Sequence, residues 1–304
     1  MPIDYKKIFK SRELRGKIIR LFAFVPDKAM LKLQYRIKFG RKLDLDHPTR
    51  FSEKLQWYKL YYRIPLMKTC ADKAEVRHYV AQCGYEDILV PLIGVYTQAS
   101  EINFEKLPSK FVIKDTLGGG GNSVIICKNK KDINMDYVNN KMSQWVKSSC
   151  SYKQGGREWP YEGKHRIIVE NYLETTNPNV EMVEYKFFCF YGEPKLLYVI
   201  ANRIIGQDAC LGIFTPDFEQ LDIYRNDERR LTQKMEKPKQ YEKMLEIAKS
   251  LSKPFPEVRI DLYYINENIY FSEMTFFDGS GYVSFTPDSF DYEFGKMFRL
   301  PEKV

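Results

Sequence analysis

Two carboxylates, an arginine and a threonine are spaced so that all four would share one face of a predicted hairpin. Arg259 and Asp261 lie on the first β-like run, Glu273 and Thr275 lie on the second, and a polar turn at 266–268 joins the two runs. A three-residue turn places Asp261 opposite Glu273. The other face of the hairpin would then pack inward, and it carries Ile260, Leu262, Met274 and Phe276. Because opposite side chains lie about 4.5–5.5 Å apart at Cβ, these carboxylates would repel each other unless they share a cation. Mg²⁺ commonly binds one or two carboxylates together with phosphates. The hairpin therefore predicts a magnesium site, and the alternative is an acidic face turned to water.

A run of glycines between two further β-like runs, 111–114 and 124–127, is suited to binding phosphate. The run and the asparagine after it are Gly118, Gly119, Gly120, Gly121 and Asn122. Glycine has no Cβ, so its backbone N–H group can approach an anion closely. A P-loop would need Gly-Lys-Ser/Thr opening a helix, whereas this loop opens a strand. We therefore predict a flap that folds over phosphates, with Lys114 at its mouth; a flexible hairpin tip is the alternative.

Composition excludes several classes of protein. The chain has 304 residues, 44% of them hydrophobic, which is enough for a sizeable core and two or three subdomains. No apolar run approaches the roughly 18–20 residues of a membrane span, and no signal peptide is predicted. Six cysteines and three histidines are scattered without a C-x-x-C pair, which argues against zinc and against a disulfide framework. A reducing cytoplasm is the compartment that we expect.

Positive charge is concentrated at the N-terminus. Residues 1–42 hold 13 Lys and Arg against three acidic residues, a net charge of +10, whereas the whole chain carries +8, which leaves −2 for residues 43–304. Apolar residues alternate with the basic ones, so the segment could lie on the anionic inner face of a membrane. The alternative is a solvated face of helices that pack on the body. No nucleic-acid-binding signature accompanies the charge.

The remaining periodicities predict an α+β protein. Helices are predicted over residues 26–40, 51–63, 72–83, 136–146 and 241–251, and strands over 88–96, 111–114, 124–127, 167–170, 185–190 and 195–200. Strands paired in hairpins and mixed with helices favour α+β over a doubly wound sheet. We expect a basic helical segment at 1–66, a small subdomain with the glycine flap at 67–165, and a larger subdomain at 166–304.

The order of these motifs resembles the ATP-grasp superfamily, whose two α+β subdomains hold ATP between them. The resemblance implies an adenine-binding hinge at Glu-x-Tyr-Leu-Glu, in which the Glu170 carboxylate and the backbones of Asn171 and Leu173 contact the ring. It implies phosphate contacts from Lys114 and Lys186.

The same resemblance implies roles for the hairpin. Asp261, Glu273 and Thr275 would be Mg²⁺ ligands, and Arg259 would stabilise an oxyanion in the transition state. Arg203, at the end of a predicted strand, is a candidate for binding a substrate carboxylate.

Five shorter motifs narrow the resemblance to the TupA-like ATP-grasp family over roughly residues 50–300. They are FSEKLQW at 51–57, ADK at 71–73, REW at 157–159, YKFFCFYGEPK at 185–195 and FTP at 285–287. Two departures stand out. The usual Glu-x-Asn at the metal is Glu273-x-Thr275 here, and the usual flap Lys-x-Asn-His-Gly-Ser-Gly has lost its amide and histidine.

The family resemblance implies an ATP-dependent, ADP-forming ligase of surface-polysaccharide or capsule biosynthesis. It would join an amine, such as an amino acid, to the carboxylate of a uronic acid on a lipid-linked or nucleotide-linked sugar. Two alternatives stay open. Asp44-Leu45-Asp46 is a D-x-D of the kind that binds metal and nucleotide sugar in glycosyltransferases, and the basic N-terminus would suit a non-catalytic scaffold at a membrane surface.

Overall fold

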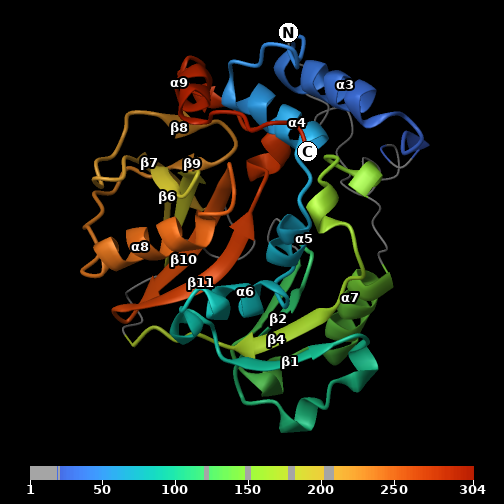
Figure 1. The fold of residues 1–304 in the computed structure, drawn as a ribbon. Helices are drawn as coiled ribbons and strands as arrows, with labels where there is room; N and C mark the ends of the chain where they lie inside the picture. The colour runs from blue at the N-terminus through green and yellow to red at the C-terminus, as the bar shows by residue number, and fades with distance from the viewer. Residues whose placement is uncertain (1–18, 20, 120–122, 148–151, 177–181, 202–208) are drawn as a thin grey trace.

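Two mixed layers of sheet and helix make up most of the molecule (Figure 1). The structure is a computed structural model, and it describes residues 19, 21–119, 123–147, 152–176, 182–201 and 209–304. A four-stranded sheet lies at the bottom of Figure 1, a six-stranded sheet lies at the left, and helices of the N-terminal region lie along the top. None of the described helices is long and apolar enough to cross a membrane.

The smaller sheet has the strand order β1-β4-β2-β3, and all its pairs are antiparallel. Its strands are β1 (Leu92–Tyr96), β2 (Phe111–Asp115), β3 (Val124–Cys127) and β4 (Ile167–Asn171). Helix α7 (Met135–Lys147) buries Val138, Met142 and Trp145 against it, as a 3.6-residue period requires. β4 belongs to this sheet, so the chain leaves the sheet at Asn171 and not at residue 165, where the sequence analysis divided the subdomains.

The larger sheet has the strand order β11-β10-β5-β6-β7-β9. Its strands are β5 (Val183–Phe190), β6 (Glu193–Ala201), β7 (Cys210–Phe214), β9 (Arg229–Arg230), β10 (Val258–Ile265) and β11 (Asn268–Thr275). Helix α8 (Tyr241–Ser252) contacts β5, β6 and β10 along its apolar stripe. The predicted inward residues Ile260, Leu262, Met274 and Phe276 are all buried, which leaves the other face of β10 and β11 for polar side chains.

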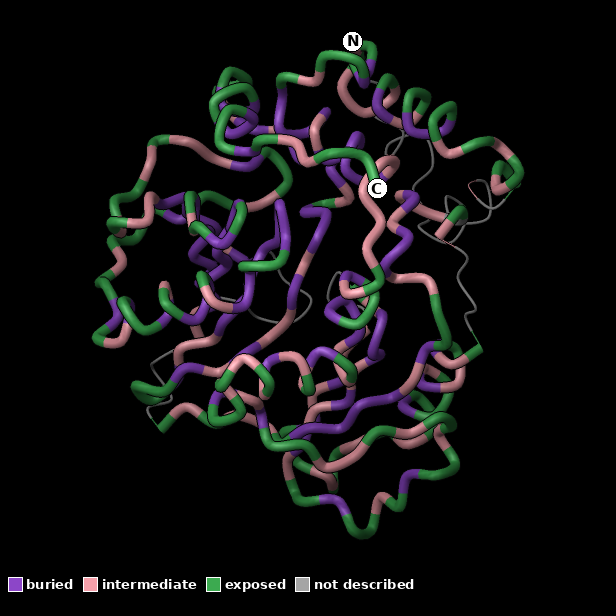
Figure 2. Tube along the Cα trace, in the orientation of Figure 1, coloured by how far each residue is buried: buried purple, intermediate pink, exposed green. Residues whose placement is uncertain are grey.

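The other α-helices that the structure describes pack on the core of the larger sheet or, in the case of α3, on α4. They are α3 (Asp27–Phe39), α4 (Phe51–Tyr61), α5 (Pro65–Ala71), α6 (Val76–Gln82) and α9 (Phe290–Met297). Phe51 of α4 stacks on Phe294 of α9 with ring centroids 3.9 Å apart. Figure 2 shows buried residues along the strands of both sheets and exposed residues on the outer turns of α3. α4 is therefore buried between α9 and the sheet, whereas α3 lies at the surface.

The remaining elements are short. They are the strands β8 (Tyr224–Arg225) and β12 (Phe285–Thr286), which pair with each other, and 3-10 turns at Glu86–Ile88, Ala99–Glu101, Phe104–Lys106, Lys130–Asp132, Tyr152–Gln154, Trp159–Tyr161 and Asp278–Gly281. Two predicted boundaries differ from the structure by more than two residues. Residues 86–88 form a turn, so β1 begins at Leu92. The Asp72 carboxylate accepts from the backbone N–H groups of Ala74 and Glu75 in a turn, and the helix begins only at Val76.

Candidate active site

The β10–β11 hairpin pairs Asp261 with Glu273, as predicted. The turn itself has two residues and not three. Asn266 and Glu267 both have positive φ (52° and 61°), as a tight type I′ hairpin turn requires. A β-bulge at Ser272 adds back one residue on β11. The predicted turn length was therefore wrong, and the predicted pairing is right because the bulge compensates for the shorter turn.

The same bulge decides which side chains of β11 face inward. Phe271 and Glu273 are two residues apart, so a regular strand would place them on one face. With Ser272 bulged out, Phe271 is 5% exposed and packs in the core, while Glu273 lies on the opposite, polar face.

Asp261 is fully buried between two cations. Arg259 donates from Nε to Asp261 Oδ1 and from Nη2 to Oδ2, each at 2.7 Å, and it also donates to the Thr275 hydroxyl at 3.1 Å. Lys186, which faces Asp261 from the neighbouring strand β5, donates to Asp261 Oδ2 and to Glu184 Oε1. The strand register therefore brings the predicted Arg259, Lys186, Asp261 and Thr275 together.

Glu273 is the more accessible of the two carboxylates, with 32% of its side chain exposed. Burial disfavours its ionised form, but the positive charges of Lys73, Lys186 and Arg259 outweigh that effect and lower the pKa of Glu273 to about 2. Its closest cation is the Lys73 ammonium at 3.4 Å. Repulsion between the two carboxylates was expected; in the structure each has its own cationic partners.

Lys73, which is not among the predicted site residues, connects the glycine flap to the hairpin. Its Nζ donates to the carbonyl of Gly118 at 2.6 Å, its backbone N–H donates to the Thr116 carbonyl, and it pairs with Glu273. The ADK motif at 71–73 was the only signal in the sequence. The motif alone does not say that this lysine reaches the opposite subdomain.

Lys114 and Glu170 lie on adjacent strands of the smaller sheet. Lys114 Nζ donates to Glu170 Oε2 at 2.7 Å, and Arg77 donates to the other oxygen at 3.0 Å. Asn171 is exposed at the end of β4, and Leu173 is half-buried just beyond it. The predicted adenine contacts are thus placed at the point where the chain leaves one sheet for the other, and their role stays a prediction.

Some predicted site residues lie outside the described part of the chain. Of the flap, Gly118 and Gly119 are described. The residues outside it are Gly120, Gly121, Asn122 and Arg203.

Asp278 is a second residue that sequence reasoning missed. Its carboxylate accepts from Arg259 and, at 3.3–3.4 Å, from Arg225 of β8. Arg225 also binds Asp227 and lies 5.5 Å from the centre of the buried Tyr198 ring. Burial alone would lower the pKa of Arg259, but Asp261 and Asp278 raise it well above its usual value. The guanidinium of Arg259 is therefore held by a carboxylate on each side.

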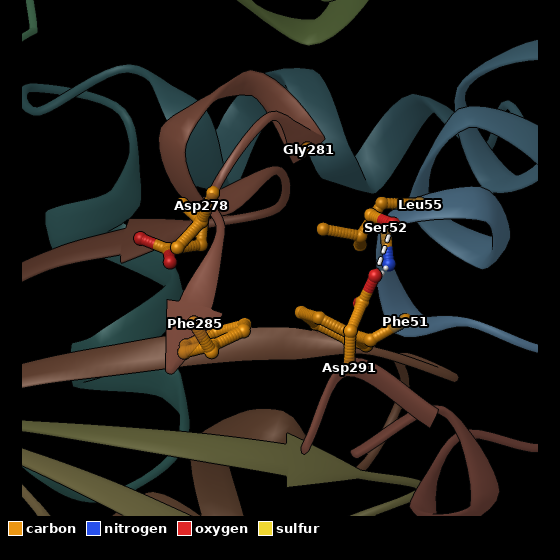
Figure 3. Close-up of a pocket in the computed structure, with 8 residues that line it drawn as sticks. Phe51, Ser52, Leu55, Asp278, Gly281, Phe285 and Asp291 are labelled. Carbon is orange, nitrogen blue, oxygen red and sulfur yellow. Dashed lines mark hydrogen bonds between the residues drawn. The ribbon is translucent and has the colours of Figure 1, made fainter. Parts of the chain in front are cut away.

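A small cavity beside this cluster is too small for a substrate (Figure 3). Its volume is about 10 Å³, the space of a single water molecule. Ser52 on one of its walls donates through its hydroxyl and its backbone N–H to the Asp291 carboxylate, at 2.7 and 2.9 Å.

The donor set fits Mg²⁺ bound together with phosphates. Among the described residues, no group of three His, Cys, Asp or Glu side chains could hold a metal ion alone. Asp261 and Glu273 supply carboxylate oxygens on one face, and Thr275 adds a hydroxyl next to Arg259. Two carboxylates plus substrate phosphates is a usual Mg²⁺ environment. The ammonium groups of Lys73 and Lys186 neutralise these carboxylates in the structure.

Comparisons with solved structures find low similarity. The L-amino acid ligase of Bacillus licheniformis has 14% identity and a TM-score of 0.47, over 85% of this chain and 57% of that one. The D-alanine–D-alanine ligase of Bacillus anthracis has 18% identity and a TM-score of 0.42, over 68% and 56%. The biotin carboxylase domain of the Hydrogenobacter thermophilus 2-oxoglutarate carboxylase has 19% identity and a TM-score of 0.39, over 68% and 39%. The chain thus spans about two fifths to three fifths of the length of these proteins.

The comparison with family models gives a match over most of the chain. No curated protein matches it. The family model for TupA-like ATP-grasp proteins, however, matches residues 53–299, from the first turn of α4 to beyond α9. This range includes the hairpin, the glycine flap and every cation described above, and so the chain belongs to the TupA-like ATP-grasp family.

Proposed function

We propose that the protein is an ATP-dependent, ADP-forming carboxylate–amine ligase. The observation that carries the proposal is the charge arrangement on β10 and β11. Arg259, Asp261 and Glu273 share one face of the hairpin, and lysines from two other elements, Lys73 and Lys186, point at the same carboxylates. The glycine flap is joined to this face through Lys73. Such a site can neutralise a triphosphate from several sides.

In the proposed reaction, a carboxylate oxygen of the substrate attacks the γ-phosphorus of ATP. The bond to the ADP oxygen breaks, and an acyl phosphate forms. Positioning and charge neutralisation provide most of the catalysis in such transfers. Mg²⁺, held by Asp261, Glu273 and Thr275, would neutralise phosphate charge. Lys73, Lys114 and Lys186 would orient the phosphates, and the flap would keep water from the acyl phosphate.

In the second step, an amine nitrogen attacks the acyl carbon. Arg259 would donate hydrogen bonds to the oxyanion of the tetrahedral intermediate, and phosphate leaves as the C–O bond breaks and the amine loses a proton. The loss of one such donor typically costs about 10²–10³ in rate. Asp278 holds Arg259 in place for this task.

The substrate assignment rests on the family resemblance. We propose a uronic acid carboxylate, on a lipid-linked or nucleotide-linked sugar of surface-polysaccharide biosynthesis, and an amino acid or other amine. The glycosyltransferase alternative has lost its local support. The Asp44 carboxylate accepts from the backbone N–H groups of Asp46 and His47, so the D-x-D triplet forms a turn.

Release of ADP from Mg·ATP tests this function. We expect the full chain to form ADP when hexuronic acids, free or UDP-linked, are supplied with hydroxylamine or an amino acid, and to form a hydroxamate with hydroxylamine. Thermal stabilisation should be larger with Mg·ATP than with UDP-glucose. A protein stabilised only by the nucleotide sugar would be a glycosyltransferase instead, and one that neither binds nor hydrolyses ATP would be a scaffold.

We also propose that α3 rests on an anionic membrane surface; residues 1–18 and 20 of the basic segment lie outside the described part of the chain. Lys28, Lys32 and Arg36 are exposed on α3 at intervals of four residues, which places them on one side of the helix. Apolar side chains lie beside them, with Phe24 83% and Leu33 48% exposed. Basic residues with exposed apolar neighbours suit an interface with anionic lipids.

Vesicle flotation with a matched pair of variants tests this surface. Phe24→Glu/Leu33→Glu should abolish binding to phosphatidylglycerol vesicles. Leu92→Glu/Tyr137→Glu makes the same charge change at exposed apolar residues of the small sheet and α7, and should leave binding unchanged. Binding of the wild type should fade at high salt, because the screening length falls from about 10 Å at 0.1 M to 3 Å at 1 M. Equal flotation of both variants would refute the membrane contact.

Point variants are preferable to deletion of the N-terminal segment. Asp27, at the start of α3, binds Arg157 at 2.9 Å and Arg63 at 3.0 Å. The Arg157 guanidinium is fully buried and also binds the Phe22 carbonyl at 2.9 Å. Removing residues 1–42 would leave that charge without its partners.

A further inference from the structure

The loop that carries Asp278 has a backbone that must be held in place. Gly279, Ser280 and Gly281 all have positive φ (51°, 56° and 66°). This region is unfavourable for a residue with a Cβ, so Ser280 keeps its conformation only if the surroundings impose it. Asp278, at the start of this loop, accepts a hydrogen bond from Arg259 Nη1, the guanidinium nitrogen that does not bind Asp261.

Two side chains of α4 bind this loop through its carbonyl groups. Lys59 Nζ donates to the Ser280 carbonyl at 2.6 Å, to the Gly156 carbonyl at 2.8 Å and to Gln56 Oε1 at 3.1 Å. Gln56 Nε2 in turn donates to the Gly281 carbonyl at 2.9 Å. All three donor positions of the ammonium are thus used on neutral acceptors, and two of the three neighbours belong to segments far away in the sequence.

Burying the charged side chain of Lys59 costs free energy that an apolar side chain at this position would not cost. The side chain is fully buried. Burial lowers the pKa of Lys59 to about 8, although the charge of Glu158 partly opposes this shift. Among the described residues no carboxylate bonds to the ammonium, which is held by the carbonyls of Ser280 and Gly156 and by the side chain of Gln56.

We propose that Lys59, with Gln56, is a positioning residue of the active site. It holds the Asp278–Gly281 loop so that Asp278 fixes the guanidinium of Arg259 toward the reacting carbonyl. The effect of Lys59 on catalysis rests on the proposed function of Arg259, whereas its effect on the loop does not. Through Lys59, the buried helix α4 would contribute to catalysis, although it lies outside the two sheets that carry the proposed site.

The experiment compares Lys59→Met with Lys54→Met in the full chain. Lys54 lies on the same helix and also donates to two backbone carbonyls, those of Gly295 and Phe298 at 2.8 and 2.7 Å, but these belong to the α9 region. Amide hydrogen exchange reports on the loop through the N–H groups of Ser280 and Tyr282, which are bonded within it at 2.9 and 3.0 Å. We expect exchange at these two amides to be about tenfold faster, or more, in Lys59→Met only.

Kinetics separate positioning from a general loss of stability. Lys59→Met should bind Mg·ATP with unchanged affinity and should keep the KM for ATP, while kcat for ADP formation falls by about 10-fold or more, since Arg259 is no longer oriented. Gln56→Met removes the bonds of Gln56 to the Ser280 and Gly281 carbonyls, at 3.2 and 2.9 Å, and one acceptor of Lys59, while Lys59 keeps its bond to the Ser280 carbonyl. This variant should also show faster loop exchange and a lower kcat, both by a smaller factor. It replaces Lys59→Met in the experiment if that variant does not fold.

The two proposals fail in different ways. Equal loop exchange in the Lys59→Met and Lys54→Met variants, or faster exchange with unchanged kcat, would overturn the positioning role. A wild-type protein that does not form ADP would overturn the ligase function, and the exchange result would still decide whether Lys59 holds the loop.

Discussion

The Asp261→Asn and Glu273→Gln variants should both lose ADP formation, by more than the roughly 10–100-fold that loss of an outer partner of a metal ligand costs. The reason is that each change removes one carboxylate of the proposed Mg²⁺ site. The two variants should differ sharply in stability. Asp261 is fully buried between Arg259 and Lys186, so its loss leaves two cations facing each other and should cost about 3–5 kcal/mol. Glu273 is partly exposed, so its loss should cost less than the loss of Asp261.

Urea unfolding in EDTA and in MgCl₂, together with ADP release, measures both effects. Added Mg²⁺ with ATP should stabilise the wild type and neither variant. Glu242→Gln, which breaks an exposed ion pair with Lys237, is the control and should change neither quantity. Near-normal turnover in both purified site variants would show that the metal assignment is wrong. The hairpin pairing alone suggested that removing either carboxylate would relieve repulsion; the cations around Asp261 reverse that expectation.

Replacement of Lys114 or Lys186 by Ala should weaken binding of ATP far more than binding of adenosine. Loss of a charge-assisted hydrogen bond to phosphate costs about 1.5–3 kcal/mol, or roughly 10–100-fold in the dissociation constant. Lys114 lies near the end of β2, next to the flap, and binds Glu170 of the proposed adenine site; its contact with phosphate is what the family resemblance implies. Lys186→Ala should also lower stability, because it leaves the buried carboxylates of Glu184 and Asp261 without this partner.

Calorimetric titration with Mg·ATP, ADP and adenosine distinguishes phosphate contact from a structural role. Lys110→Ala is the matched control, because Lys110 pairs with Glu174 at 2.8 Å just before the same strand and is 40% exposed. It should leave all three affinities unchanged. If ATP and adenosine affinities fall equally in Lys114→Ala, the lysine supports the fold and does not bind phosphate.

Local patterns predicted the elements and part of the site. The alternation of apolar and polar residues in β10 and β11, and the apolar stripe of α8, can each be recognised within a few residues of sequence. The alternation predicted that Ile260 and Leu262 face inward. The Asp261–Glu273 pairing was also predictable, because it depends on a single hairpin. The bulge at Ser272 was not, since no residue type in this stretch marks it.

The residues that sequence reasoning missed depend on contacts between distant segments. Lys73 reaches Glu273 across 200 positions, and Lys59 reaches Ser280 across 221. No periodicity records such contacts, and a lysine in a helix is usually a solvated residue. Asp278 was missed because it follows the strand in an irregular loop, and its importance appears only when Arg225 and Arg259 are both seen to bind it.

The bulge at Ser272 separates the part of the hairpin next to the turn from the part that carries Glu273. Next to the turn, the inward side chains of β11 pack in the core, and beyond the bulge Glu273 places a charge on the polar face. A change of turn length by one residue would shift the pairing along the whole hairpin, so Asp261 faces Glu273 only when a two-residue turn and the bulge occur together. A different two-residue turn could therefore replace Asn266 and Glu267 and keep the cation-binding end, provided that the bulge is kept.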